Sequence, residues 1–363
     1  MIKPHQFLGL AAASAVSVLV AVGVWLGSNN WAAGKVEGAQ FLPDLAQGIN
    51  SVAAIEVTHA GKTLTVERSG QAWRLRDRSG YPAKSEPART LLVALAGSQL
   101  VEPRTSVKDK LSLLELEDPT AKDAKSRRVR VLDASGKALA DAILGKTRFD
   151  AFGSGKGGMY VRRASETQSW LATGDPRVTA DVKDWVDTKV LAVETAKVAK
   201  VIIESPGEAP LVIERTPPAP KDAAAKDGKA PPPPPSAEKP AKYQLAKMPD
   251  DKKLKSAGAV DDVVDALGSV DLDDVRKLDA TPAGDAVQIV KVESDGGLGL
   301  TLRLRKDGEA RWLSVSAAGG EGDAKKKADE INARAQGWEF KIPTWKADQI
   351  GKRAADLFEA KAS

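Results

Sequence analysis

The sequence predicts an α+β protein, with an N-terminal transmembrane helix followed by two similar domains built mainly on antiparallel sheet. Three observations predict this class. An uncharged, apolar run lies near the N-terminus. The body behind it contains short alternating strand patterns and amphipathic helix patterns. Both kinds of pattern recur in its two halves, and short strands with one or two helices per half are typical of α+β domains.

Residues 7–27 contain no charged side chain. At 1.5 Å per residue such a run spans about 30 Å, which is the thickness of a bilayer's hydrocarbon core. Lys3 precedes the run, and no Lys or Arg follows it before Lys35. The positive-inside rule then places the N-terminus in the cytoplasm and the body outside it. We therefore expect a single-pass anchor in the bacterial inner membrane over residues 1–30, with a periplasmic body.

A cleaved signal peptide is the competing interpretation of the same run. A signal peptide has a shorter apolar region, of about 7–15 residues, followed by an Ala-x-Ala-like site. The nearest pair of small residues, Ala32-Ala33, has Trp31 where a small residue is required. An uncleaved anchor is favoured, followed by a linker over residues 31–50.

The body carries an internal duplication, which predicts copies over residues 51–194 and 195–363. Three strand motifs of the first copy recur in order in the second: Val52–Val57 as Val198–Ile203, Leu64–Arg68 as Leu211–Arg215, and Trp73–Leu75 as Tyr243–Leu245. Later segments correspond more loosely: Val129–Val131 resembles Leu302–Leu304, and Gly158–Val161 resembles Gly337–Phe340.

Each copy also contains one amphipathic helix pattern. Apolar residues follow a spacing of i, i+3, i+4, i+7, which places them on one face of a helix. They are Ala88, Leu91, Leu92 and Leu95 in the first copy, and Val260, Val263, Val264 and Leu267 in the second.

Residues 216–240 form a Pro-rich stretch that cannot build a core. An interdomain linker is the first interpretation, but the repeat argues against it. A short turn at Ser69-Gly70 joins two strands in the first copy, and the Pro-rich stretch occupies the equivalent place in the second. We expect a loop insertion inside a hairpin of the second copy.

Composition excludes several classes of function. Apolar residues make up 42% of the chain, which is enough to bury real cores. The absence of cysteine excludes disulfides, thiolate metal sites and thiol nucleophiles. The net charge of +5 comes from interspersed charges, so the basic face of a nucleic-acid binder is not expected.

No motif reaches the standard of an active site, so we expect no catalytic, cofactor-binding or metal-binding residue and no cofactor. His59 lies in a predicted strand-turn, where a structural role is commoner than a place in a catalytic triad. The glycine-rich Gly153–Gly158 lacks the spacing of a phosphate loop, and Asp271-x-Asp273-Asp274 lacks the glycine and glutamate of an EF-hand. The Ser236–Lys239 pair falls in the Pro-rich stretch.

Several motifs, taken in order, resemble the bacterial domain of unknown function 4340. They are Glu67-Arg68 with Trp73, Tyr81-Pro82-Ala83, Leu114-Glu-Leu116-Glu-Asp118-Pro119, Gly145-Lys146 and Tyr160-Val161. The resemblance covers most of the first copy and, more weakly, the second. Typical members carry a Gly-Leu-x-x-Pro-like turn, and Glu115 stands where its glycine would be. The resemblance implies a membrane-anchored envelope protein, often encoded beside ABC-type transport or gliding-motility-like auxiliary proteins, and no catalytic residue.

The leading hypothesis is a non-catalytic accessory or scaffold subunit of a bacterial envelope membrane complex, associated with an ABC transporter or a gliding-motility-like system. Its expected partners are integral membrane proteins, such as an ABC-type permease or auxiliary subunit, and the lipid bilayer through residues 7–27. The alternative is a periplasmic binding module for a glycan, lipid or peptide, with a pocket lined by Trp73, Trp170 or Trp185. The competing interpretation places these tryptophans in the core. A hydrolase is the least favoured hypothesis.

Overall fold

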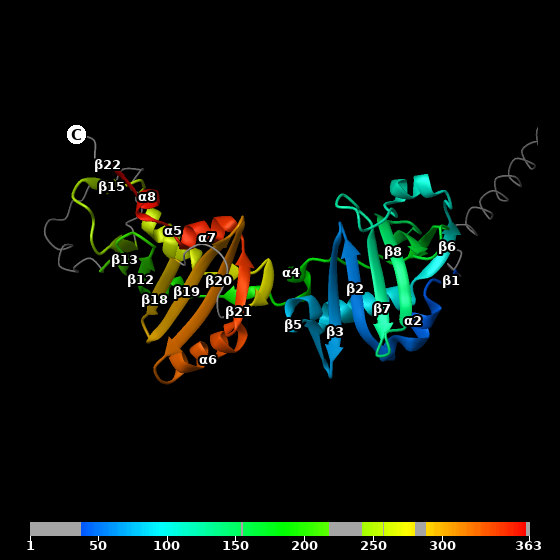
Figure 1. Ribbon diagram of the computed structural model, residues 1–363, viewed down its shortest axis with the longest axis horizontal. Helices are drawn as coiled ribbons and strands as arrows, with labels where there is room; N and C mark the ends of the chain where they lie inside the picture. The colour runs from blue at the N-terminus through cyan, green and yellow to red at the C-terminus, as the bar shows by residue number, and fades with distance from the viewer. Residues whose placement is uncertain (1–37, 154, 218–241, 257, 280–287, 361–363) are drawn as a thin grey trace, which may run out of the picture. The chain divides into compact units, whose positions relative to one another are not determined.

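The computed structural model describes residues 38–153, 155–217, 242–256, 258–279 and 288–360 (Figure 1). The chain divides into two compact units. Among the described residues, the first unit holds 38–77 and 82–180, and the second holds 78–81 and the residues from 181 onward. The mainly antiparallel, sheet-rich α+β class is confirmed.

A ten-stranded sheet dominates the first half of the chain. Its strands lie in the order β1 (Ala39–Gln40), β6 (Gln99–Pro103), β10 (Trp170–Thr173), β9 (Gly158–Arg163), β8 (Ala138–Arg148), β7 (Arg127–Asp133), β2 (Val52–His59), β3 (Lys62–Ser69), β4 (Ala72–Leu75), β5 (Tyr81–Ala83). Tight turns connect neighbouring strands. Between β2 and β3, for example, Ala60 and Gly61 both have positive φ, as in the hairpin turns that match strand twist.

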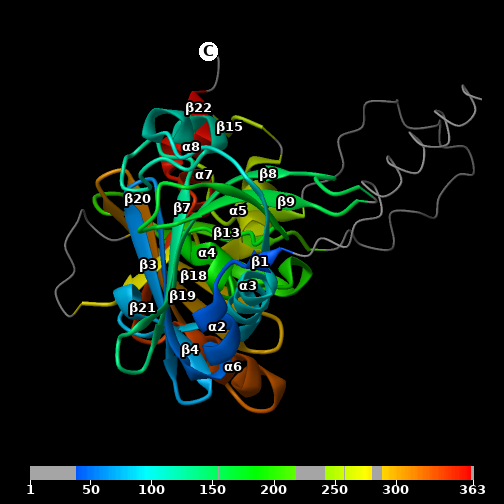
Figure 2. The same ribbon diagram turned by 90° about the vertical axis from the view of Figure 1, so that its right-hand side faces the viewer.

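Two helices, α2 (Pro43–Gly48) and α3 (Ser85–Gly97), pack side by side, and α2 also contacts β8 (Figure 2). The predicted stripe of α3 is confirmed, because Ala88, Leu91, Leu92 and Leu95 are all buried. Short 3-10 helices occupy Ile49–Ser51, Arg76–Arg78 and Lys108–Leu114.

Part of the segment expected to be a linker folds with the first unit. β1 pairs with β6, and α2 buries Leu45 completely. Phe41 and Leu42 are also buried. Residues 39–50 are therefore part of the domain, because their apolar side chains fill its core rather than face solvent.

The second unit is built on an eight-stranded sheet. Its order is β14 (Tyr243–Leu245), β13 (Leu211–Arg215), β12 (Val198–Glu204), β18 (Gln288–Ser294), β19 (Leu298–Asp307), β20 (Ala310–Gly319), β21 (Trp338–Ile342), β17 (Asp274–Lys277). Two small ladders pair β11 (Lys189–Leu191) with β16 (Val270–Asp271), and β15 (Lys252–Leu254) with β22 (Phe358–Ala360). The helices are α4 (Val182–Trp185), α5 (Ala259–Ala266), α6 (Asp323–Ala335), α7 (Thr344–Ile350) and α8 (Ala354–Leu357), with a 3-10 helix at Thr195–Lys197.

The helices of the second unit pack on its sheet in two groups. α5 contacts α7 and β14, and α7 contacts β20. α6 follows β20 and packs against β20, β19 and β11 (Figure 1). The apolar stripe predicted for the second helix is confirmed in α5, where Val260, Val263 and Val264 are buried, as is Leu267 just after it.

The second unit begins earlier than Thr195, the start expected from the repeat. Val182 and Trp185 of α4 are buried, and β11 pairs with β16. The Pro-rich stretch itself lies outside the described residues apart from its first two. On either side of it β13 and β14 pair, with Arg215 opposite Tyr243, so it connects two strands of one hairpin.

The two large sheets share one strand order. In the first sheet the Cα partners run across the strands as Leu75, Val66, Ile55, Val131, Ala140, and in the second as Leu245, Ile213, Val201, Val292, Leu300. Further across, Leu144, Val161, Trp170, Pro103 correspond to Leu304, Leu313, Phe340, Val275. The eight strands of the second sheet therefore correspond to eight strands of the first at these ladder positions, and register shifts such as the one between Leu144 and Thr147 interrupt the match elsewhere.

This register agrees with the early repeat motifs and corrects the later ones. Val129–Val131 in β7 corresponds to Val290–Val292 in β18, not to Leu302–Leu304 in β19. Likewise β9 corresponds to β20, and not to the segment that starts at Gly337. The sequence comparison slipped by one strand because alternating apolar strands look alike, and only the pairing distinguishes them.

Among the described residues, no helix is long and apolar enough to cross a membrane. The anchor expected over residues 7–27 lies outside the described residues.

Candidate functional site

The residues considered for catalysis or metal binding are not brought together. His59 ends β2, opposite Lys62 in the hairpin. Asp271 accepts hydrogen bonds from Thr188 and Ser269. Asp274 accepts two from Arg78, at 2.6 and 3.0 Å. Within the part of the chain that the structure describes, no group of three or more acidic or histidine side chains could hold a metal ion.

The three tryptophans expected to line a pocket lie away from the two cavities described below. Trp73 is buried in β4, and Trp185 is 2% exposed in α4. Trp170 is half-buried in β10, opposite Val161 and Pro103. None of the three lines either of the cavities described next.

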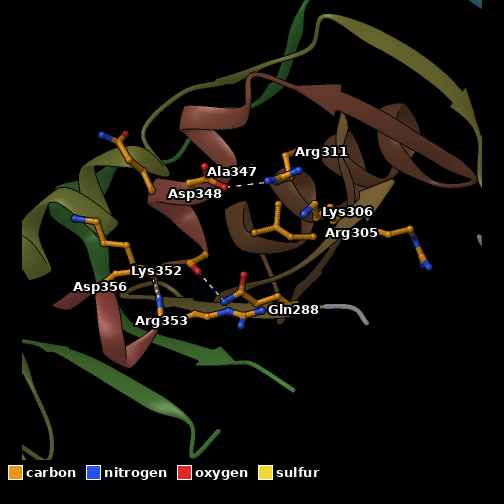
Figure 3. Close-up of a pocket in the computed structure, with 12 residues that line it drawn as sticks. Gln288, Arg305, Lys306, Arg311, Ala347, Asp348, Lys352, Arg353 and Asp356 are labelled. Atoms are coloured by element: carbon orange, nitrogen blue, oxygen red, sulfur yellow. Dashed lines mark hydrogen bonds and ion pairs between the residues drawn. The ribbon is translucent and has the colours of Figure 1, made fainter. Parts of the chain in front are cut away.

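A cavity of about 630 Å³ lies in the second unit, between the ends of β18, β19 and β20 and the α7–α8 segment (Figure 3). We call it the basic cavity because cations predominate in its lining. It is lined by Gln288, Leu304, Arg305, Lys306, Arg311, Ala347, Asp348, Gln349, Gly351, Lys352, Arg353 and Asp356.

One wall of the basic cavity depends on a contact between Gln288 and Gly351. The Gln288 side-chain amide donates a hydrogen bond to the Gly351 carbonyl (Figure 3) and another to the Ser205 hydroxyl, and both bonds are 2.7 Å long. A Cβ at position 351 would overlap the amide oxygen of Gln288. Glycine therefore lets the start of β18 approach the end of α7 closely.

Among the described residues, three cations of the basic cavity form only ion pairs of 3.5 Å or longer. Arg311 lies 3.5 Å from Asp348, and a dashed line marks this pair in Figure 3. Lys352 lies 3.8 Å from Asp262 and Arg353 lies 3.8 Å from Glu208. Charge-assisted hydrogen bonds are usually about 2.7–2.9 Å long, so these cations keep much of their hydrogen-bonding capacity.

Arg305 differs from the other cations because it is neutralised on the opposite face of the sheet. There its guanidinium lies 3.3 Å from Glu339, which also pairs with Arg276 at 2.8 Å. Arg276 in turn pairs with Asp307 and lies over the ring of Trp312, 3.9 Å from its centre. Glu339 and Arg305 have side chains only 3% and 11% exposed. We call these five residues the arginine cluster.

A second cavity of about 610 Å³ lies between β11, the β18–β19 turn and α6. Its charges balance, with Lys189, Lys197, Lys327 and Arg334 against Glu194, Asp295, Asp323 and Glu330. Hydrogen bonds from Lys197 and Lys327 lower the pKa of Glu194 to about 2. This cavity therefore presents no excess of either charge.

In the first unit, several of the motif residues converge on one small cluster. Leu111, Leu116 and Ile143 form its core, and Leu114, Tyr160 and Ala164 pack on it. The Arg162 guanidinium donates to the carbonyls of Leu116, Ala164 and Glu166. Burial lowers the pKa of Arg162. Leu114 and Leu116 of the turn and Tyr160 of β9 thus lie together in one apolar cluster.

A family model described as "Domain of unknown function (DUF4340)" matches residues 73–286, which is more than half of the chain. The chain belongs to this family. The match runs from β4 of the first unit into the second unit, so DUF4340 membership involves both. The family resemblance noted in the sequence is confirmed. Comparisons with curated proteins and with solved structures found no match.

Sequence reasoning missed the basic cavity. Its lining comes from β18, β19, β20, α7 and α8, which only the fold brings together. One local signal exists: Gly351-Lys352-Arg353 places two adjacent cations directly after a glycine between two helices.

Proposed function

We propose that this DUF4340 protein is a non-catalytic accessory or scaffold subunit of a bacterial envelope membrane complex, associated with an ABC transporter or a gliding-motility-like system. The observation that carries the proposal is the shared strand order of the two large sheets, which supports a tandem duplication of one domain. A duplicated body offers two related surfaces for partner proteins. The uncharged run over residues 7–27 would hold this body at the periplasmic face of the inner membrane.

The experiment has a topological and a biochemical arm. A reporter that is active only in the periplasm, fused after Ser363, should be active, and a cytoplasmic reporter should be silent. The full-length chain, expressed at its native level and extracted in mild detergent, should copurify with integral membrane proteins that include a permease. In a matched variant, a cleavable signal peptide replaces residues 1–30. The integral membrane proteins should no longer copurify with this variant from the membrane fraction.

Two results would contradict this proposal. One is a C-terminus that reports a cytoplasmic location. The other is recovery of the intact chain alone from the detergent extract.

A second candidate function is a periplasmic binding module for a glycan, lipid or peptide. The basic cavity favours it over the hydrolase hypothesis. Asp348 and Asp356, the carboxylates of the cavity, are both engaged, Asp348 with Arg311 and Asp356 with the backbone N–H of Arg353. No observation places either of them as an acid or base opposite a scissile bond.

A further inference from the structure

We propose that the basic cavity of the second unit binds a phosphomonoester group. The proposal rests on the second candidate function, the binding module, and names its ligand class. It needs no partner protein, so it fails or succeeds separately from the accessory role.

The first argument is the charge of the cavity. Arg305 is satisfied by Glu339 on the other face of the sheet, which leaves four cations in the lining. Set against Asp348 and Asp356, these four leave an excess of two positive charges within the lining, while Asp262 and Glu208 lie outside it, 3.8 Å from Lys352 and Arg353. A phosphomonoester carries about −1.5 to −2 charges at pH 7 and three strong acceptor oxygens. The ligand charge therefore matches the excess.

The second argument is that these four cations retain N–H hydrogen-bond donors for a ligand. The shortest ion pair among them, from Arg311 to Asp348, measures 3.5 Å. Lys306 makes no ion pair or hydrogen bond through its side chain among the described residues. A planar guanidinium such as that of Arg311 presents paired N–H donors that suit phosphate oxygens.

The third argument is enclosure. A volume of about 630 Å³ falls within the range of small-molecule sites, about 300–1,000 Å³. Leu304 and Ala347 supply apolar wall, and the Gln288–Gly351 contact closes one side. An anion held against these walls would be partly shielded from water, which strengthens its hydrogen bonds.

The fourth argument comes from the corresponding place in the first sheet. By the ladder register, Arg311 corresponds to Met159, and its partner Lys306 to Thr147, the partner of Met159. The α7–α8 segment that supplies Lys352 and Arg353 follows β21 in the second unit. The second unit therefore carries cations at two ladder positions where the first sheet has Met159 and Thr147, and the exposed Lys146 and Arg148 flank Thr147 in the first sheet.

The test measures binding of glycerol 3-phosphate to the full-length chain in mild detergent by calorimetry, at pH 7 and low salt. Dihexanoyl phosphatidic acid carries the same group on a lipid, and succinate carries two carboxylates instead. Saturable binding of either phosphate probe, at least about tenfold tighter than that of succinate, supports the proposal. If only the lipid binds, the phosphate is that of a lipid headgroup; if both bind, a soluble phosphomonoester suffices.

Two double variants test whether binding depends on the cavity or only on the net charge of the chain. Lys306→Glu with Arg353→Glu should weaken binding by about tenfold or more, because two charge-assisted contacts are lost. Lys146→Glu with Arg148→Glu makes the same change in net charge on exposed β8 positions of the first unit and should leave affinity unchanged. Both pairs are exposed, and a thermal melt confirms that each variant is folded. No saturable binding of either phosphate probe, equal binding of succinate, or equal loss in the control pair would overturn the proposal.

Discussion

At Glu115 the backbone is left-handed, with φ of 56°, at the end of the 3-10 helix Lys108–Leu114. This is the position where the family turn usually has glycine. A glycine adopts this conformation without steric cost, whereas other L-residues pay about 1 kcal/mol or more. The sequence showed the departure from the family pattern, and the structure shows that the turn nevertheless keeps the glycine-like conformation.

Gly145 allows the same turn to lie against β8. A Cβ at this position would overlap the carbonyl oxygen of Leu114, which is backbone and cannot rotate away. We expect Gly145→Ala to lower the free energy of unfolding by about 1–3 kcal/mol, as overpacking usually does. Chemical denaturation measures it. Gly97→Ala is the control, because its Cβ would meet nothing within 4 Å. A Gly145→Ala variant as stable as the control would show that the turn does not need this contact.

Among the elements, β17, β19, β20 and β21 are tied together by the arginine cluster. Glu339 on β21 accepts from Arg276 on β17 and Arg305 on β19. At the equivalent place in the first sheet, by the ladder register, Ser169, Arg104 and Gly145 stand instead. Arg104 also lies over an aromatic ring, that of Tyr160, at 5.7 Å. The arginine-on-aromatic pair is common to both sheets, and the buried glutamate belongs to the second.

Replacing the buried carboxylate of Glu339 tests how much the arginine cluster stabilises the fold. Glu339→Gln keeps the shape but removes the buried carboxylate that Arg305 and Arg276 share, and Arg276 keeps its pair with Asp307. We expect a loss of about 3 kcal/mol in unfolding free energy, because breaking a buried ion pair on one side leaves a charge unpaired. Glu359→Gln is the control, since its pair with Lys253 is about half exposed, and it should change stability by less than about 1 kcal/mol. Equal losses of unfolding free energy for the two variants in urea denaturation would mean that the cluster stabilises the fold no more than an exposed ion pair does.

Because β13 pairs with β14, a prediction follows for the Pro-rich insertion that connects them. In the first sheet Gly70 and Gln71 connect the corresponding strands. Replacing residues 217–241 with this dipeptide should leave the unfolding free energy equal or higher, because loop-closure entropy falls as a loop shortens, by about 0.6 kcal/mol for each halving of length. Thermal denaturation measures the change, and circular dichroism checks the strand content. A marked loss of stability would show that the insertion packs on the folded domain.

On the scale of the whole molecule, each of the two units buries apolar side chains of its own. Leu95 on α3 and Leu267 after α5 are each fully buried, one in each unit. We expect Leu95→Ala and Leu267→Ala each to lower the stability of their own unit by about 2–5 kcal/mol. Differential scanning calorimetry should then show two transitions, of which each variant shifts a different one. A single transition that both variants shift equally would mean that the units unfold as one.

The sequence by itself determined the family, the α+β class, the two helix stripes and the early strand motifs of the repeat. These properties are local, since periodicity and residue order along the chain carry them. Only the tertiary structure decided which later strands correspond, that residues 39–50 belong to the first unit, and that cations from the ends of β19 and β20 and from the α7–α8 segment surround one cavity. Those properties depend on pairing register and on contacts between distant segments, and alternating apolar strands that look alike in sequence do not record which neighbour they pair with.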